Sequence, residues 1–183
     1  MRDRIDALDW PGLTASLAAR GWATTGPLLS PAECAGLRQS YEDEERFRTR
    51  VVMARHRFGE GEYKYFARPI PPLVTALREA SYERLAPVAR QWNQALGIDS
   101  AFPDTHADFI ARCRQLGQLR PTPLLLRYAT GGYNCLHQDL YGKVHFPLQM
   151  VVMLSRPVED YTGGHFLLVE NRPRAQSAGE AIL

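Results

Sequence analysis

The chain has 183 residues, of which 45% are hydrophobic and 23% charged, and 22 Lys and Arg against 20 Asp and Glu give a formal charge of +2. This composition is typical of one globular domain, excludes a disordered chain, and does not by itself imply a polyanionic partner. The chain has no apolar run of the roughly 20 residues that a membrane span needs. The three cysteines include no CxxC pair, which excludes a disulfide scaffold and a cysteine-cage zinc site, so we expect a cytoplasmic protein without membrane contact.

The first 120 residues predict helices and one hairpin. Ser30, Pro31 and Glu33 form a capping-box pattern with proline at the first helical position, so a helix should begin there. The turn Gly59-Glu60-Gly61 separates two alternating segments, which predicts a hairpin. The elements expected in chain order are a helix over 9–20, a strand over 22–25, a helix over 30–47, a hairpin of residues 48–57 and 62–68, and helices over 71–96 and 104–116.

The remaining residues predict short strands without intervening helices. Apolar-rich segments bounded by Gly, Pro, Asp or Asn cover residues 122–129, 133–140, 146–155 and 165–170, and a fifth begins at 179. Such a succession is typical of a sandwich or jelly-roll barrel. We therefore expect an α+β fold in one domain, residues 1–183, with a helical and hairpin part over 1–120 and a partial jelly-roll core over 121–183.

The candidate chemistry lies in residues 127–139, Arg-Tyr-Ala-Thr-Gly-Gly-Tyr-Asn-Cys-Leu-His-Gln-Asp. On a strand, residues two apart project to the same face, so His137 and Asp139 should point the same way. An imidazole and a carboxylate are two members of the facial triad of non-haem Fe(II) oxygenases. A local surface hydrogen bond between the two side chains is the alternative interpretation.

This segment resembles the 2-oxoglutarate/Fe(II)-dependent dioxygenase superfamily. The run RYxxGGxxxLHQD is similar to the AlkB-type nucleic-acid demethylases, whereas GEYKYF, QWN and GGHFLLVE resemble an uncharacterised bacterial family of the same superfamily. The resemblance implies a double-stranded β-helix core, Fe(II) held by His137 and Asp139, and 2-oxoglutarate and O₂ as cosubstrates. It also implies that Tyr128 helps to bind 2-oxoglutarate, and that a substrate C–H bond is hydroxylated with release of succinate and CO₂. The AlkB-type asparagine two residues before this tyrosine is Leu126 here.

The family pattern also contains a distal histidine and an arginine that pairs with 2-oxoglutarate. His145 and His165 follow Asp139, but the first is expected in a connecting loop and the second at a strand start, so we expect neither to be the third ligand. Arg172 and Arg174 are candidates for the cation but are expected in a surface turn. We therefore expect a chain that is truncated before the distal ligand and its arginine.

Candidate substrate-binding residues lie in the predicted hairpin. Tyr63, Lys64 and Tyr65 combine aromatic rings, which stack on bases, with a cation that can pair with phosphate, although the same pattern describes a half-buried strand. Further backbone contacts could come from Arg46, Arg48, Arg50, Arg55 and Arg57. Oxidative demethylation of alkylated or single-stranded nucleic acid is the preferred function. Prolyl or amino-acid hydroxylation by the same chemistry, or an inert jelly-roll binding fragment, are the alternatives.

Overall fold

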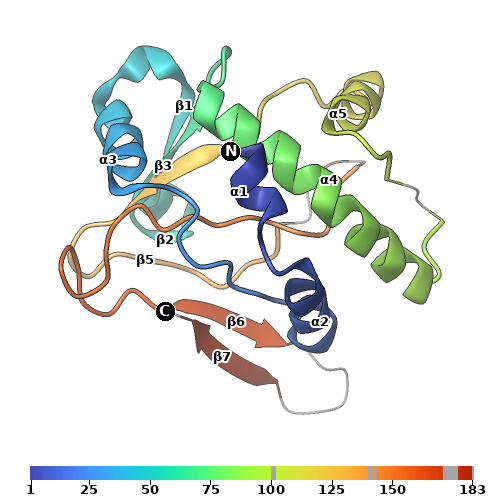
Figure 1. Cartoon of the computed structure of the whole chain (residues 1–183). Helices are drawn as coiled ribbons and strands as arrows, with labels where there is room; N and C mark the ends of the chain where they lie inside the picture. The colour runs from blue at the N-terminus through green and yellow to red at the C-terminus, as the bar shows by residue number, and fades with distance from the viewer. Residues whose placement is uncertain (100–101, 140–141, 143, 171–176, 183) are drawn as a thin grey trace.

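The computed structural model describes residues 1–99, 102–139, 142, 144–170 and 177–182. Runs of helices and runs of strands follow one another in an α+β arrangement (Figure 1). The α-helices are α1 (Arg2–Asp6), α2 (Trp10–Arg20), α3 (Pro31–Gln39), α4 (Pro72–Ala95) and α5 (His106–Gln115), and the 3₁₀ helices are η1 (Ser40–Glu42), η2 (Glu44–Arg46) and η3 (Met53–His56). The strands are β1 (Phe47–Val52), β2 (Gly59–Glu60), β3 (Glu62–Phe66), β4 (Leu124–Arg127), β5 (Tyr133–Asn134), β6 (Phe166–Glu170) and β7 (Ala178–Ile182).

Side-chain caps determine where the first long helices begin. The Asp9 carboxylate accepts the Gly12 N–H at the start of α2, and Gly21 ends the same helix with a φ of 78°, a value that glycine adopts readily. At α3 the predicted capping box is present, because the Glu33 N–H donates to the Ser30 hydroxyl and the Ser30 N–H donates to the Glu33 carboxylate. Both predicted helix starts are confirmed.

The helix that begins at Pro31 is shorter than the sequence pattern predicts. It ends at Gln39 instead of continuing to residue 47, and two 3₁₀ turns lead into β1. Phe47 pairs with Phe66 of β3, and the two rings stack with centroids 5.0 Å apart. Sheet pairing and aromatic packing therefore override the helical pattern over the last eight residues of the predicted element.

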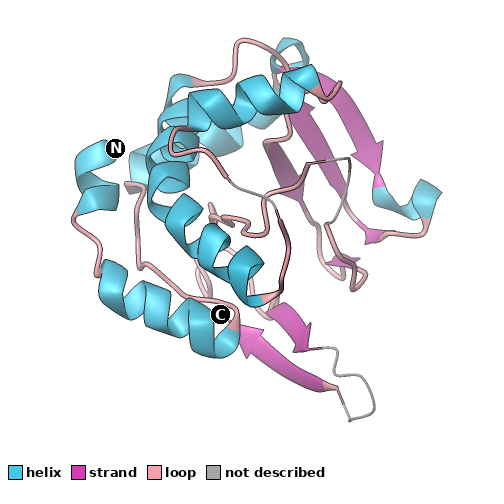
Figure 2. Cartoon of the chain, turned by 90° about the vertical axis from the view of Figure 1, so that its right-hand side faces the viewer, coloured by secondary structure: helices cyan, strands magenta, loops and turns pink. Residues whose placement is uncertain are grey.

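The largest sheet of the described residues is antiparallel and has three strands in the order β1-β3-β4. The predicted hairpin is present as β1 and β3, with η3 and β2 in the connection between them. Alternate residues of β3 point in opposite directions, so Glu62, Lys64 and Phe66 are buried while Tyr63 and Tyr65 lie on the outer face. Figure 2 shows the long helices on one side of this sheet, which leaves its outer face uncovered by them.

The core is built mainly around α4. Tyr82 of α4 stacks on Phe109 of α5 with ring centroids 5.1 Å apart, and Phe102 completes that cluster. Leu77 of the same helix packs with Leu29 and Leu37. None of the described helices combines the length and the apolar character that a bilayer span requires.

The second half contains fewer strand residues than predicted. Of the predicted strand at 133–140, the structure describes residues 133–139, and of these only Tyr133–Asn134 form a strand. Residues 146–155 and 22–25, which were also predicted as strands, form none. Two small sheets, β2-β5 and β6-β7, accompany the central one, and the described residues form no closed barrel. The mixed helix and strand content agrees with the prediction, and the jelly-roll assignment stays a prediction.

Candidate functional site

The structure brings His137 and Asp139 together just after β5. The Nε2 atom of His137 lies 3.5 Å from the Oδ1 atom of Asp139. Neither residue is in a strand, so the expected alternation of a strand does not produce this geometry. Instead, the chain leaves β5 in an irregular conformation that turns both side chains toward each other.

Each member of this pair is oriented by a second polar group. The Nδ1 atom of His137 lies 2.7 Å from the Cys135 carbonyl oxygen, which can only accept, so Nδ1 carries a proton and, in the neutral imidazole, Nε2 presents the lone pair. The Gln149 side chain donates from Nε2 to Oδ2 of Asp139 over 3.2 Å, which leaves Oδ1 directed at the imidazole. Hydrogen bonds of this kind commonly orient metal ligands.

The free donor atoms fit a pair of ligands on one metal ion. Transition-metal bonds to imidazole nitrogen and carboxylate oxygen are about 2.0–2.2 Å long, so two adjacent donors on one ion lie roughly 3–3.5 Å apart. The measured separation is within that range. Both side chains are a little under half exposed, so a small ligand can reach them.

Two donors are the most that the described residues bring together here. In residues 1–99, 102–139, 142, 144–170 and 177–182, no group of three or more His, Cys, Asp or Glu side chains could hold a metal ion. His145 and His165 are therefore not assembled with the pair into such a group. Arg172 and Arg174, the candidates for a 2-oxoglutarate cation, lie outside the described residues.

Two glycines bring the neighbouring strands close to this segment. A Cβ atom at Gly59 would collide with the Tyr133 carbonyl oxygen across the β2–β5 pair. At Gly61 a Cβ atom would lie 2.7 Å from the Tyr128 ring, and the φ of 154° also favours glycine. The turn that the sequence identifies therefore permits the close contact between the hairpin and β5.

Tyr128, the predicted 2-oxoglutarate contact, lies at the end of β4 next to this turn. Its ring contacts Gly61, and its hydroxyl shares a hydrogen bond with the side chain of Asn134, three residues before His137. Burial raises the pKa of Tyr128, so the phenol stays protonated at neutral pH and can donate a hydrogen bond. Its contact with 2-oxoglutarate stays a prediction.

The three predicted substrate residues lie on opposite faces of the sheet. Lys64 is 2% exposed, and its ammonium donates to the Tyr41 carbonyl oxygen and to the Glu44 carboxylate, both at 2.7 Å. Tyr63 and Tyr65 lie on the outer face, with ring centroids 5.5 Å apart. The Lys64 ammonium thus has its partners inside the protein, whereas the two tyrosines are half-buried on the outer face.

Sequence reasoning did not find Gln149 or the Cys135 carbonyl. Gln149 lies ten residues after Asp139 in a segment that reads as a strand, and nothing in its sequence context marks it as a partner of the carboxylate. The Cys135 contribution is a backbone oxygen, which the residue type cannot reveal.

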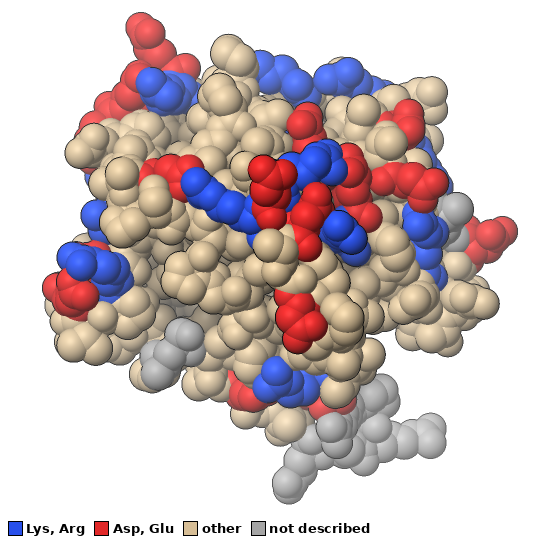
Figure 3. All heavy atoms as spheres, in the orientation of Figure 1, with Lys and Arg blue, Asp and Glu red and all other residues tan. Residues whose placement is uncertain are grey.

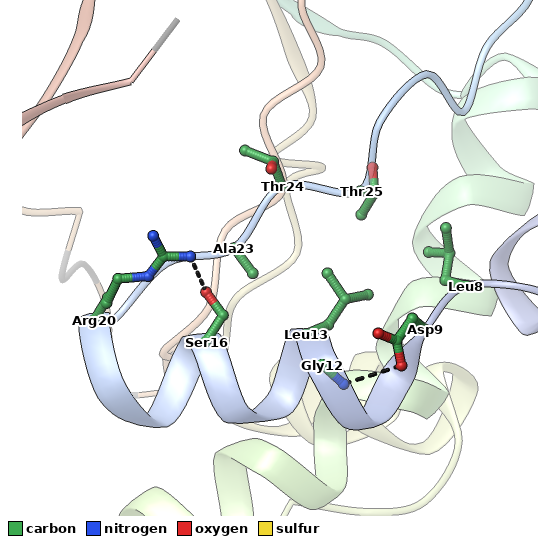
Figure 4. A pocket seen from close by; sticks show the side chains of 9 residues that line it. All are labelled: Leu8, Asp9, Gly12, Leu13, Ser16, Arg20, Ala23, Thr24 and Thr25. Carbon is green, nitrogen blue, oxygen red and sulfur yellow. Dashed lines mark hydrogen bonds between the residues drawn. The ribbon is translucent and has the colours of Figure 1, made fainter.

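A hollow of about 340 Å³ lies elsewhere, between α2 and residues 23–25 (Figure 4). Its charged side chains already have partners, because Asp9 caps α2 and Arg20 donates to the Ser16 hydroxyl. None of the predicted site residues lines it, so it does not extend the His137–Asp139 site.

Comparison with known proteins identifies a family that this chain matches. The profile of the family Oxygenase-NA, described as an oxygenase catalysing oxidative methylation of damaged DNA, matches residues 61–183. Two uncharacterized proteins of Mycobacterium tuberculosis are similar to the chain, MT2286 of strain CDC 1551 / Oshkosh and Rv2227 of strain ATCC 25618 / H37Rv. Each is 50% identical to it over 117 residues, which make up 64% of this chain and 50% of the relative. The chain thus spans about half the length of the curated relatives it matches. No solved structure matches it.

Proposed function

Because this chain belongs to the Oxygenase-NA family, we propose that it is an Fe(II)- and 2-oxoglutarate-dependent dioxygenase that oxidises alkylated bases of damaged DNA. The single observation that supports this chemistry best is the pair of His137 Nε2 and Asp139 Oδ1, 3.5 Å apart and each oriented by a second group. The damaged-DNA substrate is supported by the description of the family.

In this proposal the residues hold and orient the reactants. His137 and Asp139 bind Fe(II), the Cys135 carbonyl keeps the imidazole in the Nδ1-protonated form, and Gln149 keeps the carboxylate turned toward it. Tyr128 would donate a hydrogen bond from its hydroxyl to a carboxylate of 2-oxoglutarate. When bound, iron and 2-oxoglutarate supply the oxidising chemistry, in which O₂ is consumed, succinate and CO₂ are released and a substrate C–H bond is hydroxylated.

Anaerobic calorimetric titration with Fe(II), or with Co(II) as a redox-silent substitute, tests the metal site. We expect His137→Ala and Asp139→Ala each to abolish the binding measured for the unchanged chain. Gln138→Ala is the matched control, because Gln138 lies between the two ligands and is exposed. Equal binding by all four proteins would contradict the proposed site.

Succinate release tests the reaction and its substrate. We expect methylated single-stranded DNA to stimulate succinate formation from 2-oxoglutarate, and a proline-rich peptide to have no effect. Stimulation by the peptide alone would favour prolyl hydroxylation. Metal binding without succinate formation under any condition would favour the inert binding module.

A further inference from the structure

Four consecutive side chains, at the end of η3 and in the turn that leads to β2, are exposed and combine two cations with two aromatic rings. They are Arg55, His56, Arg57 and Phe58, and we call residues 55–58 the basic loop. Phe58 is 45% exposed, and its ring stacks on His56 with centroids 5.3 Å apart and planes 24° apart. The stacked pair presents an aromatic face on the surface, and nucleic-acid bases stack on such faces.

The basic loop is attached directly to the candidate metal site. The Cys135 N–H donates to the Phe58 carbonyl oxygen over 2.7 Å, and the Cys135 thiol lies 3.7 Å from the Arg57 carbonyl oxygen. The carbonyl of the same cysteine orients His137. One residue therefore connects the loop to the imidazole, so a strand bound along the loop would pass beside the His137–Asp139 pair.

No carboxylate in the part of the chain that the structure describes neutralises the charges of the basic loop. Neither Arg55 nor Arg57 has a carboxylate partner among the described residues, whereas the face formed by α1 and α4 interleaves acidic and basic side chains through pairs such as Arg2–Glu83 and Arg84–Asp6 (Figure 3). The other arginines near the hairpin also have partners, since Arg46 pairs with Asp43, Arg50 pairs with Glu62, and Arg48 donates to the Pro121 carbonyl. Two cations of the five identified in the sequence thus remain available for phosphates.

The backbone at Arg57 gives an independent observation. Its φ is 60°, a left-handed conformation that is unfavourable for a residue with a Cβ atom and that glycine adopts without strain. The Phe58 N–H donates to the Met53 carbonyl and holds this turn in place. Strained positions occupied by a large side chain are frequent in ligand-binding segments, and here the strain presents a guanidinium to solvent.

From these observations we propose that the basic loop is the surface that binds the DNA strand next to the metal site. Arg55 and Arg57 pair with two backbone phosphates, and Phe58, supported by His56, stacks on a base. This inference rests on the proposed function for the identity of the partner, and it adds the residues that hold the strand. It assigns the phosphate contacts to the loop in place of Lys64.

Fluorescence anisotropy with a labelled, undamaged single-stranded oligonucleotide, without iron or 2-oxoglutarate, tests the phosphate contacts. Because each contact contributes about 0.7 to the slope of log K against log salt for single strands, the double variant Arg55→Gln/Arg57→Gly should reduce the magnitude of that slope by about 1.4. Glycine is chosen at position 57 because it fits the left-handed backbone. The matched control is Arg114→Gln on α5, which neutralises another exposed arginine that has no carboxylate partner among the described residues and should leave the slope unchanged.

Phe58→Leu tests the stacking contact, because leucine keeps an apolar side chain but removes the ring. We expect the affinity to fall about 5- to 150-fold with an unchanged salt slope, the range that corresponds to loss of one base stack. Absence of oligonucleotide binding by the unchanged chain, an unchanged slope in the double variant, or an equal slope change in Arg114→Gln would overturn the inference.

The same variants separate this inference from the proposed function. Co(II) binding should be equal in the unchanged chain, the double variant and Phe58→Leu, since none of them alters His137 or Asp139. If DNA binding depends on the loop but no metal binds, the loop assignment stands and the oxygenase site is refuted. If metal binds but the loop variants bind DNA normally, the loop assignment is refuted alone.

Discussion

Replacing Lys64 with methionine separates a structural role of this residue from a role in substrate binding. Methionine keeps the unbranched apolar stem of lysine inside the sheet but removes the ammonium. The Lys64 side chain is 2% exposed, and its ammonium donates to the Tyr41 carbonyl and the Glu44 carboxylate and lies 4.4 Å from the centroid of the Tyr41 ring. The substitution therefore removes three interactions without creating a large cavity.

The expected loss of stability depends on the environment in which each partner of the Lys64 ammonium is left after the substitution. The Tyr41 carbonyl loses a charged donor in a buried position, which costs about 1–3 kcal/mol, and the lost cation–π contact costs up to about 2 kcal/mol. Glu44 adds little, because its side chain is 70% exposed and regains water. We expect Lys64→Met to lower the free energy of unfolding by about 2–4 kcal/mol, or the melting temperature by roughly 5–15 °C.

Urea denaturation measures this change, and Glu44→Gln is the matched control because it removes only the exposed partner. We expect less than about 1 kcal/mol for the control and unchanged oligonucleotide affinity for folded Lys64→Met. A loss below about 0.5 kcal/mol together with weaker DNA binding would refute the structural interpretation and restore Lys64 as a substrate residue.

Three further predictions follow from individual contacts. Gly59→Ala should lower the free energy of unfolding by about 2–4 kcal/mol in urea titrations and weaken metal binding, because the new methyl group collides with the β5 backbone; a neutral result would contradict the β2–β5 pairing. Gln149→Leu should weaken Co(II) binding about 10- to 100-fold in calorimetry by releasing Asp139, and unchanged affinity would count against that positioning role. Burial lowers the pKa of His106 to about 4. Below about pH 6.5 the unfolded chain therefore binds a proton at this histidine that the folded chain does not bind. As a result, the free energy of unfolding decreases as the pH falls from 6.5 toward 4. Thermal melts across this pH range should show that His106→Gln loses about 1–2 kcal/mol less stability on acidification than the unchanged chain, a value reduced for the partial solvation of the ring. Parallel pH profiles for the two proteins would show that His106 does not cause the loss of stability.

Local signals in the sequence predicted the helix starts because the responsible contacts are themselves local. Asp9 caps α2 and Ser30 caps α3 within three residues of their own positions. The end of α3 was predicted wrongly because it depends on Phe47, which pairs with Phe66 nineteen residues later. A strand likewise needs a partner, which explains why the apolar segment at 146–155 reads as a strand but is not one.

The candidate site was predicted in its residues but not in its geometry. The spacing of His137 and Asp139 suggested a common strand face, whereas the structure brings them together in an irregular segment. Gln149 was not predicted, because its partner Asp139 lies ten residues earlier and no motif links the two positions. Lys64 illustrates the opposite case, since an aromatic-basic pattern cannot tell a buried cation from an accessible one.

The strand order β1-β3-β4 has a consequence for any attempt to excise a minimal fragment. The family match begins at Gly61, immediately before β3, yet β3 is the middle strand and its partner β1 precedes that boundary. A polypeptide started at Gly61 would convert β3 into an unprotected edge prone to self-association, and would leave the Lys64 ammonium without Tyr41 and Glu44. Only a version that retains the sequence from Tyr41 onward keeps both neighbours of β3 and both partners of the Lys64 ammonium.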